Sequence, residues 1–258
     1  MELKIGHLYP DLMNLYGDRG NIIALTRRCY WHDIRATVEE IKAGEEKRAA
    51  DCDVVFIGGG QDREQKQVAW DLRDRQGPAL RAAAAEGVVI LGICGGYQLL
   101  GHEFRTGAGE VLPGTGILDL VTVGGDKRLI GNIAVVSDLL GGKTLVGFEN
   151  HSGKTYLGEG AKPLGKVLAG HGNNGEDGTE GAYCKNVVGT YLHGSVLPKN
   201  PWFTDHLIWQ GLRHGYGEVA PLRPLADEAE ETAHQTALKL AMRQKGKMTA
   251  LEATSWGR

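Results

Sequence analysis

The hydrophobic positions in the first half of the chain form short runs that alternate with helical patterns. Two of these runs, at 53–57 and 88–93, are almost wholly apolar, which is typical of strands covered on both faces. Between them, residues 76–86 have helical spacing and are followed by Gly87. The remaining elements predicted here are strands at 3–8 and 34–38 and a helix over 21–31. Strands that alternate with helices predict a parallel sheet and an α/β fold.

The second half of the chain has a different pattern. Short apolar runs follow one another with turns between them, which predicts a mixed or antiparallel extension. The strands predicted here are residues 118–123, 133–136, 144–148 and 187–192. Residues 159–181 are predicted to be a glycine-rich loop region, and helices are predicted over 202–214 and 227–245. The last helix is predicted to carry an apolar face made of Ala229, Ala233, Ala237, Leu240 and Ala241.

No internal repeat and no clear linker divides the 258 residues. We therefore expect a single domain over 1–258, a length that can bury a full core. The motifs described below lie before about residue 209, and the helical tail from about 221 to 258 carries none.

Charge and composition exclude several classes of protein. The net charge of −3 gives no basic face for nucleic acid. No apolar run approaches the roughly 18 residues of a membrane-spanning helix, and the first residues do not have the pattern of a signal peptide. The four cysteines are far apart and lack zinc-type spacing, so we expect reduced thiols, no metal site and a cytoplasmic location.

The 39 glycines gather at the ends of apolar runs. Glycine is favoured where a chain turns tightly or where the backbone approaches a ligand. This distribution predicts a site built from the loops at the ends of strands.

Cys94 stands on one of these strand ends, in Gly92-Ile93-Cys94-Gly95-Gly96-Tyr97-Gln98. A nucleophile on a sharp turn between a strand and a helix is exposed above the sheet, and small neighbours avoid clashes there. The N-terminus of the following helix favours a thiolate, and the Gly95 N–H is placed to hold an oxyanion. Taken alone, the pattern is also compatible with a buried structural cysteine.

Two further features favour catalysis. Gln98 follows one helical turn after Cys94 and lies on the same side. Gly58-Gly59-Gly60 ends a neighbouring buried strand, where a second oxyanion donor would be needed.

These segments resemble those of class I glutamine amidotransferases. The Cys94 turn is similar to their nucleophile elbow and Gly58-Gly59-Gly60 to their oxyanion loop, with Gly59 and Gly95 as the donors. Tyr191-Leu192-His193-Gly194 resembles the histidine segment of the cobyric acid synthase branch. The segments 8–21 and 147–151 resemble the GatD-type glutaminase subunits of lipid II isoglutaminyl synthases. The resemblance covers residues 1 to about 209 and implies the class I amidotransferase fold, a mostly parallel sheet flanked by helices.

A cysteine nucleophile needs a base, and the resemblance selects His193 among nine histidines. His151 is the competing candidate for the base, and its expected role is structural or close to the substrate. Many class I enzymes carry Glu two residues after the histidine to orient its ring, whereas this chain has Ser195. A Cys-His dyad is the simple interpretation, and the group that orients His193 stays open.

Glutamine also needs a partner for its α-carboxylate, for which an arginine fork is well suited. Arg128, in a predicted glycine-rich loop after a strand, is the candidate by its placement in the resembling subunits; the competing interpretation is a solvated surface arginine. Gln98 is expected to contact the substrate or to brace the elbow.

The resemblance further implies a partner. This chain contains no phosphate-binding loop, so no cofactor is expected in it, and ATP and Mg²⁺ are expected on another polypeptide. That polypeptide would be a Mur-ligase-like, MurT-type subunit that forms a heterodimer and uses the ammonia to convert D-glutamate of the lipid II stem peptide to D-isoglutamine. Lipid II would be reached through the partner, without membrane insertion of this chain. The alternatives are a stand-alone γ-glutamyl or DJ-1-like cysteine hydrolase, an amidotransferase of another pathway such as cobyric acid synthesis, and a scaffold with a decayed site.

Overall fold

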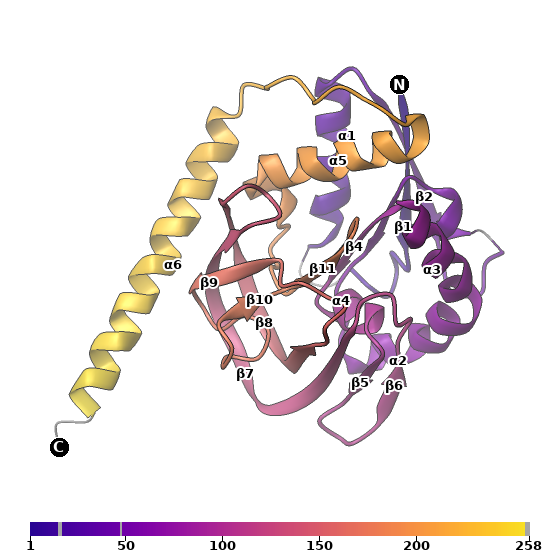
Figure 1. The fold of residues 1–258 in the computed structure, drawn as a ribbon. Helices are drawn as coiled ribbons and strands as arrows, with labels where there is room; N and C mark the ends of the chain where they lie inside the picture. The colour runs from indigo at the N-terminus through magenta and orange to yellow at the C-terminus, as the bar shows by residue number, and fades with distance from the viewer. Residues whose placement is uncertain (15–16, 47, 256–258) are drawn as a thin grey trace.

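The computed structural model of the protein describes residues 1–14, 17–46 and 48–255, with side chains as far as Lys245. Leu15 and Tyr16 of the 8–21 segment, and the last three residues of the predicted tail, lie outside the described residues. Within the described residues the chain forms two sheets of six strands each, which lie side by side in Figure 1.

The first sheet is the predicted parallel one. Its order is β11-β12-β4-β3-β1-β2, and every neighbouring pair is parallel except β11 with β12. All residues of β3 and β4 are buried, as their apolar sequences predict. The strands are β1 (Glu2–Leu8), β2 (Arg35–Ile41), β3 (Val54–Ile57), β4 (Val89–Ile93), β11 (Ala182–Cys184) and β12 (Val187–Thr190).

Helices cover both faces of this sheet (Figure 1). On one side α1 (Arg19–Trp31) packs against α5 (Pro201–Tyr216), and on the other lie α2 (Asp62–Asp71) and α3 (Gly77–Glu86). Helix α3 ends at Gly87, whose φ of 107° places it in the left-handed region that glycine adopts readily. Helix α2 was not predicted from the sequence, and a π-helical turn, η2 (Leu72–Gln76), joins it to α3. The short 3₁₀ turns are η1 (Ala49–Asp51) and η3 (Leu197–Lys199).

The second sheet corrects the sequence interpretation of the middle of the chain. Residues 118–123 and 133–136 were predicted as separate strands, but residues 120–123 and 133–136 both belong to one strand, β7 (Leu120–Ser137), which pairs with the long strand β8 (Lys143–Leu157). The pairing shifts register between Gly124 and Leu129, so the glycine-rich segment is an irregular part of a strand and not a loop. The other strands are β5 (Glu103–Arg105), β6 (Val111–Pro113), β9 (Gly165–Ala169) and β10 (Thr179–Glu180).

Strands β9 and β10 lie within the segment predicted as a loop region, and that prediction was wrong in this respect. Their brevity explains the error, since neither run is long enough to show a clear alternation of apolar and polar positions.

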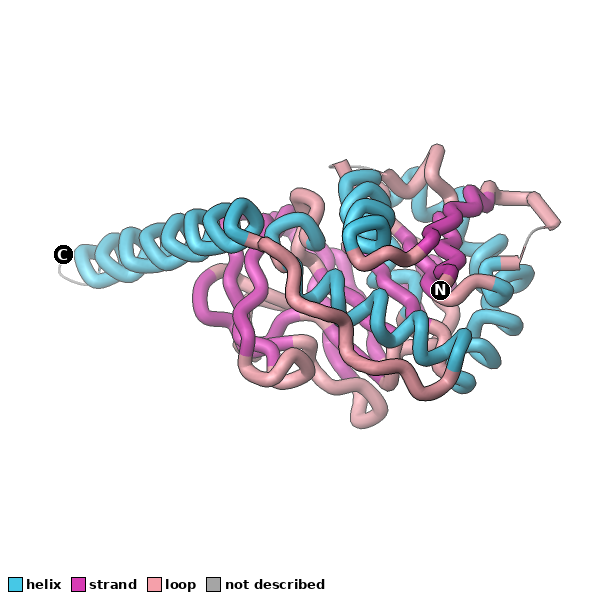
Figure 2. Tube along the Cα trace, turned by 90° about the horizontal axis from the view of Figure 1, so that it is seen from above, coloured by secondary structure: helices cyan, strands magenta, loops and turns pink. Residues whose placement is uncertain are grey.

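The last helix, α6 (Glu228–Ser255), runs along the second sheet and contacts β7, β8 and β9. Figures 1 and 2 show its C-terminal part extending beyond the sheet. Its predicted apolar face was partly wrong, because Ala229, Ala233 and Leu240 are exposed. Among the described side chains of α6, those of His234 and Ala241 are buried, and the His234 ring is hydrogen-bonded to Thr144 Oγ1 at 2.8 Å.

The strand order positions the site. In an open parallel sheet, ligands bind beyond the carboxyl ends of the strands, where the chain order reverses. Here β1 is followed by β2 on one side, and the chain then crosses to β3 on the other. The loops that leave β1, β3, β4 and β12 therefore meet at one edge of the sheet.

Candidate active site

Cys94 occupies a sharp turn between β4 and α4 (Gly95–Leu100), as the sequence predicts. Its backbone is strained, with φ of 50° and ψ of −103°. A Cβ on Gly96 would lie 2.5 Å from the Ile57 carbonyl oxygen, and one on Gly95 would lie 2.9 Å from the backbone of Gly60. The two glycines are thus required by close contact between the elbow and the loop after β3.

The Cys94 sulfur is buried in this structure. Burial, and next the nearby carboxyl of Asp18, raise the pKa of the thiol to about 12, while a hydrogen bond from the Gly95 N–H and the positive charge of Arg128 oppose the rise. Desolvation therefore outweighs the helix end that the sequence argument invoked. Cys94 rests as a thiol and needs a base to become a nucleophile.

The glycine loop after β3 faces the elbow. Its Gly59 N–H, the expected oxyanion donor, donates a hydrogen bond of 2.6 Å to Oδ2 of Asp18. Asp18 is fully buried, and this burial raises the pKa of its carboxyl to about 7, against the hydrogen bond from Gly59. Sequence reasoning missed Asp18, although it follows the first strand of the sheet, where the strand-end argument applies equally.

His193 follows β12 and reaches the same point. A Cβ placed on Gly59 would lie 3.2 Å from His193 Cε1, 3.2 Å from Asp18 Oδ2 and 3.5 Å from Cys94 Cβ. The three side chains therefore surround Gly59. Burial, then His151 and Arg128, lower the pKa of His193 to about 4, so its ring is neutral near pH 7 and able to accept a proton.

The competing histidine, His151, is held differently. Its ring stacks on that of Tyr191, with centroids 3.5 Å apart and planes 4° apart, and its Nδ1 donates a hydrogen bond of 2.7 Å to the Gly153 carbonyl. Burial lowers the pKa of His151 to about 4. Its ring lines the cavity beside Cys94, in keeping with a structural or substrate-adjacent position.

Ser195 stands where many class I enzymes have the orienting Glu. Its hydroxyl donates a hydrogen bond of 2.7 Å to the Gly17 carbonyl, and its φ is 49°. The hydroxyl thus ties the histidine loop to the segment that carries Asp18.

Gln98 forms part of a buried chain of hydrogen bonds. Its Oε1 accepts from Gln65 Nε2 at 3.0 Å, and its Nε2 donates to the Tyr191 hydroxyl at 3.0 Å. Gln65 also donates to the Gly60 carbonyl at 3.1 Å, and Tyr191 bonds to Thr155 Oγ1 at 2.7 Å. The chain links the elbow to the glycine loop and to the second sheet, which favours the bracing role for Gln98.

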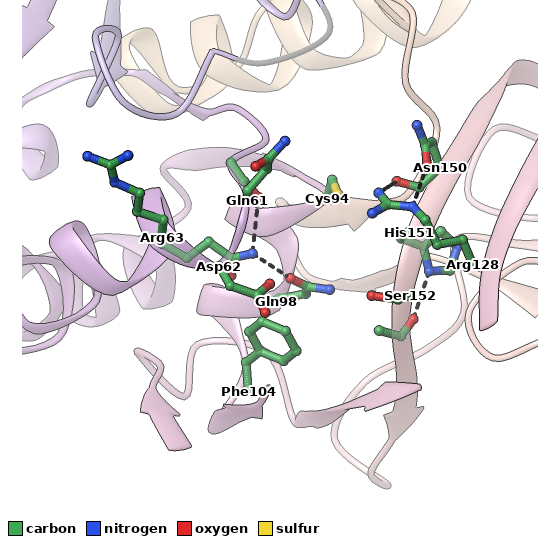
Figure 3. A pocket seen from close by; sticks show the side chains of 13 residues that line it. Gln61, Asp62, Arg63, Cys94, Gln98, Phe104, Arg128, Asn150, His151 and Ser152 are labelled. Carbon is green, nitrogen blue, oxygen red and sulfur yellow. Dashed lines mark hydrogen bonds between the residues drawn. The ribbon is translucent and has the colours of Figure 1, made fainter. Parts of the chain in front are cut away.

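A cavity of about 350 Å³ opens beside the Cys94 elbow, large enough for a small amino acid. Figure 3 shows Cys94 at its centre and Arg128 with Asn150 on one wall. Arg128 lies within β7 and not in a loop, which corrects the sequence interpretation. Its Nε donates to Asn150 Oδ1 at 3.0 Å and its Nη2 to the Asn150 carbonyl at 3.4 Å, so the guanidinium is oriented at the cavity. Asp62 at the start of α2 also lines the cavity and places a carboxylate on its far side (Figure 3).

A family model for the CobB/CobQ-like glutamine amidotransferase domain matches residues 4–201. The chain belongs to this family. It is therefore a glutamine-hydrolysing enzyme, and the sequence resemblance to class I amidotransferases is confirmed.

Two curated relatives are similar to this amidotransferase over most of its length. One is the lipid II isoglutaminyl synthase (glutamine-hydrolyzing) subunit GatD of Staphylococcus aureus, which is 45% identical over 95% of this chain and 98% of its own. The subunit of the same name from Streptococcus pneumoniae is 38% identical over 88% of this chain and 86% of its own.

Solved structures confirm the fold. A glutamine amidotransferase from Thermotoga maritima superposes with a TM-score of 0.52 at 16% identity, covering 92% of this chain and 94% of its own. At that identity the likeness concerns the fold alone.

The described residues contain no group of three or more His, Cys, Asp or Glu side chains placed to hold a metal ion. Within the same part of the chain, no helix combines the length and the apolar character needed to cross a membrane.

Proposed function

We propose that this amidotransferase is the glutaminase subunit of a lipid II isoglutaminyl synthase. The observation that carries the proposal is the likeness to the Staphylococcus aureus subunit over nearly the full length of both chains. The cobyric acid synthase resemblance of the histidine segment is shared by the wider family and does not select a pathway.

The proposed reaction begins with proton transfer. His193, neutral at its lowered pKa, takes the proton of the Cys94 thiol, and the thiolate attacks the side-chain carbonyl carbon of L-glutamine. The N–H groups of Gly59 and Gly95 stabilise the tetrahedral oxyanion. His193 then donates a proton to the leaving ammonia, and water hydrolyses the glutamyl thioester to glutamate.

The substrate is held by its α-amino acid end. Arg128 supplies the fork for the α-carboxylate, with Asn150 orienting the guanidinium. Asp62 across the cavity supplies a negative charge for the α-ammonium. Gln98 keeps the elbow in place through its bonds to Gln65 and Tyr191.

The ammonia is used by a second polypeptide. We propose a Mur-ligase-like, MurT-type partner in a cytoplasmic heterodimer, which binds ATP and Mg²⁺ and amidates D-glutamate of the lipid II stem peptide to D-isoglutamine. The names of the two relatives, each a subunit of a synthase, support this assembly.

Co-expression with a Mur-ligase-like protein from the same source tests the proposal. The two chains are expected to co-purify and to amidate lipid II with glutamine and ATP, as followed by mass spectrometry. A complex containing Cys94→Ser should fail with glutamine but still amidate with ammonium chloride, because only the ammonia source is lost. Glutamine hydrolysis without lipid II amidation by the intact complex would place this chain in another pathway.

A further inference from the structure

The Asp18 carboxyl occupies the position that the proposed reaction needs for an oxyanion. Its Oδ2 accepts a short hydrogen bond of 2.6 Å from the Gly59 N–H, the group assigned as an oxyanion donor. The side chain has no exposed surface, and its Oδ1 has no hydrogen-bond partner within the described part of the chain. A buried carboxyl with one oxygen unsatisfied is costly, which indicates that it is kept for a reason other than stability.

The contact is incompatible with the chemistry. A tetrahedral intermediate on Cys94 would place its oxygen on the same N–H, and one N–H cannot hold both oxygens well. Asp18 Oδ2 lies 3.2 Å and Cys94 Cβ 3.5 Å from the Cβ position at Gly59, so the carboxyl and the nucleophile's side chain flank the same residue. Ionised, it would also oppose the negative charge of the thiolate and of the oxyanion.

We propose that Asp18 is an autoinhibitory side chain, which fills the oxyanion hole in the resting enzyme and must leave the Gly59 N–H before glutamine is attacked. This inference rests on the proposed glutaminase site. According to this proposal, the structure corresponds to the resting enzyme, in which Asp18 blocks the oxyanion hole.

The segment around Asp18 is tied to the histidine loop. Ser195 Oγ donates to the Gly17 carbonyl at 2.7 Å, and the Leu197 N–H donates to Asn21 Oδ1 at 3.0 Å. A Cβ on Gly20 would lie only 2.2 Å from Ser195 Oγ, so the two segments are in close contact. A shift of one segment therefore moves the other, and removal of Asp18 from the hole is coupled to the position of the loop that carries His193.

A competing role makes the opposite prediction. Asp18 could orient or charge-stabilise His193 in place of the absent Glu at position 195. Removal of its carboxyl would then lower the turnover number, whereas removal of an inhibitory carboxyl raises it.

The experiment compares Asp18→Ala and Asp18→Asn with wild type, each as the free chain and as the complex with its partner. We expect Asp18→Ala to raise partner-free glutamine hydrolysis by about tenfold or more, a modest part of the roughly 10²- to 10³-fold that one oxyanion donor contributes. The same variant should react faster with 6-diazo-5-oxonorleucine at Cys94. Asp18→Asn should show a smaller gain, because its side-chain carbonyl still accepts the Gly59 N–H without a charge.

Controls separate the outcomes. Asp11→Asn removes an exposed carboxyl from the same segment and should leave hydrolysis at the wild-type rate. Melting temperatures establish that each variant is folded, and the isosteric Asn keeps the test valid if Ala unfolds the chain. Folded variants with unchanged or lower hydrolysis, beside an active wild-type complex, would refute autoinhibition by Asp18. A wild-type complex that hydrolyses no glutamine would instead refute the proposed function, and with it this inference.

Discussion

Replacement of Arg128 by alanine tests how the proposed site recognises glutamine. The guanidinium lines the cavity beside Cys94 and is oriented by two hydrogen bonds to Asn150. Its substitution removes the positive charge from one wall while leaving the elbow, the glycine loop and His193 in place. We therefore expect a defect in substrate binding that is larger than the defect in chemistry.

The magnitude follows from the contact that is lost. A charge-assisted fork to a carboxylate contributes about 1.5–3 kcal/mol, which corresponds to roughly a tenfold to hundredfold rise in KM for glutamine. Asn150→Ala keeps the charge and the bond to the backbone carbonyl of residue 150, but removes the side-chain bond from Arg128 Nε to Asn150 Oδ1. Loss of about 1 kcal/mol is expected for that variant, or about a fivefold rise in KM.

The assay is steady-state glutamine hydrolysis by the Ala and Lys variants of Arg128 and by Asn150→Ala, in the complex. Lysine should restore only part of the affinity, because an ammonium does not reproduce the planar fork. Iodoacetamide labelling of Cys94 serves as the control, since this small neutral reagent needs no carboxylate grip. Labelling should stay at nearly the wild-type rate in Arg128→Lys and fall only modestly in Arg128→Ala, because the positive charge of Arg128 lowers the pKa of the thiol.

Wild-type KM and kcat in Arg128→Ala would contradict the assignment and leave Arg128 as an exposed residue of β7. A large fall in iodoacetamide labelling would also contradict it, because the defect would then lie in the state of the thiol. Only a rise in KM with labelling that falls at most modestly supports the proposed grip.

Three further outcomes are expected. Cys94→Ser should abolish glutamine hydrolysis, and peptide mapping should find 6-diazo-5-oxonorleucine on Cys94 alone among the four cysteines. His193→Ala should lower kcat by about 10²-fold or more with little change in KM, and a matching loss in His151→Ala but not in His193→Ala would identify the other ring as the base. Burial raises the pKa of Asp18 to about 7 in the folded chain, above its value of 3.8 in the unfolded chain. The folded state is therefore favoured when Asp18 is protonated, and this stabilisation is lost as pH rises from about 4 to 7. The free energy of unfolding of wild type relative to Asp18→Asn, from urea titrations, should therefore fall by up to about 4 kcal/mol over that range, and a constant difference would show that Asp18 titrates normally.

The sequence predicted the centre of the parallel sheet well because β3 and β4 are continuous buried runs that end at glycine-rich turns. It failed in the second sheet for a physical reason. Strand β7 has exposed residues on both sides of its register shift near Gly124, so its middle lacks the alternation of a half-buried strand. Arg128 was therefore assigned to a loop. The β7–β8 pairing that places it beside Asn150 is a tertiary contact that no local pattern records.

Within the site, sequence reasoning identified the residues of sharp turns and missed those held by long-range contacts. The elbow around Cys94 and the Gly58-Gly59-Gly60 loop are encoded locally, by small residues at strand ends. Asp18 reaches Gly59 across 41 positions of sequence, and a single aspartate in a turn-rich segment resembles an ordinary turn residue. Asp18 differs from an ordinary turn aspartate in its burial, which the sequence does not show.

The two sheets make different contributions to the proposed site, so substitutions in each sheet are expected to affect KM and kcat differently. The reacting groups Cys94, Gly59 and His193 all stand at carboxyl ends of the parallel sheet, where the hydrogen-bonded strands fix their spacing. The proposed substrate grip, Arg128 with Asn150, stands on the β7–β8 pair, which meets the first sheet through the bridge between Phe148 and His193. A change on β7 that leaves this bridge intact alters how glutamine is held without moving the base. Substitutions in the α-carboxylate grip on the second sheet are therefore expected to raise KM, and substitutions of the reacting groups on the first sheet to lower kcat, with the Phe148–His193 bridge as the place where a substitution would produce both.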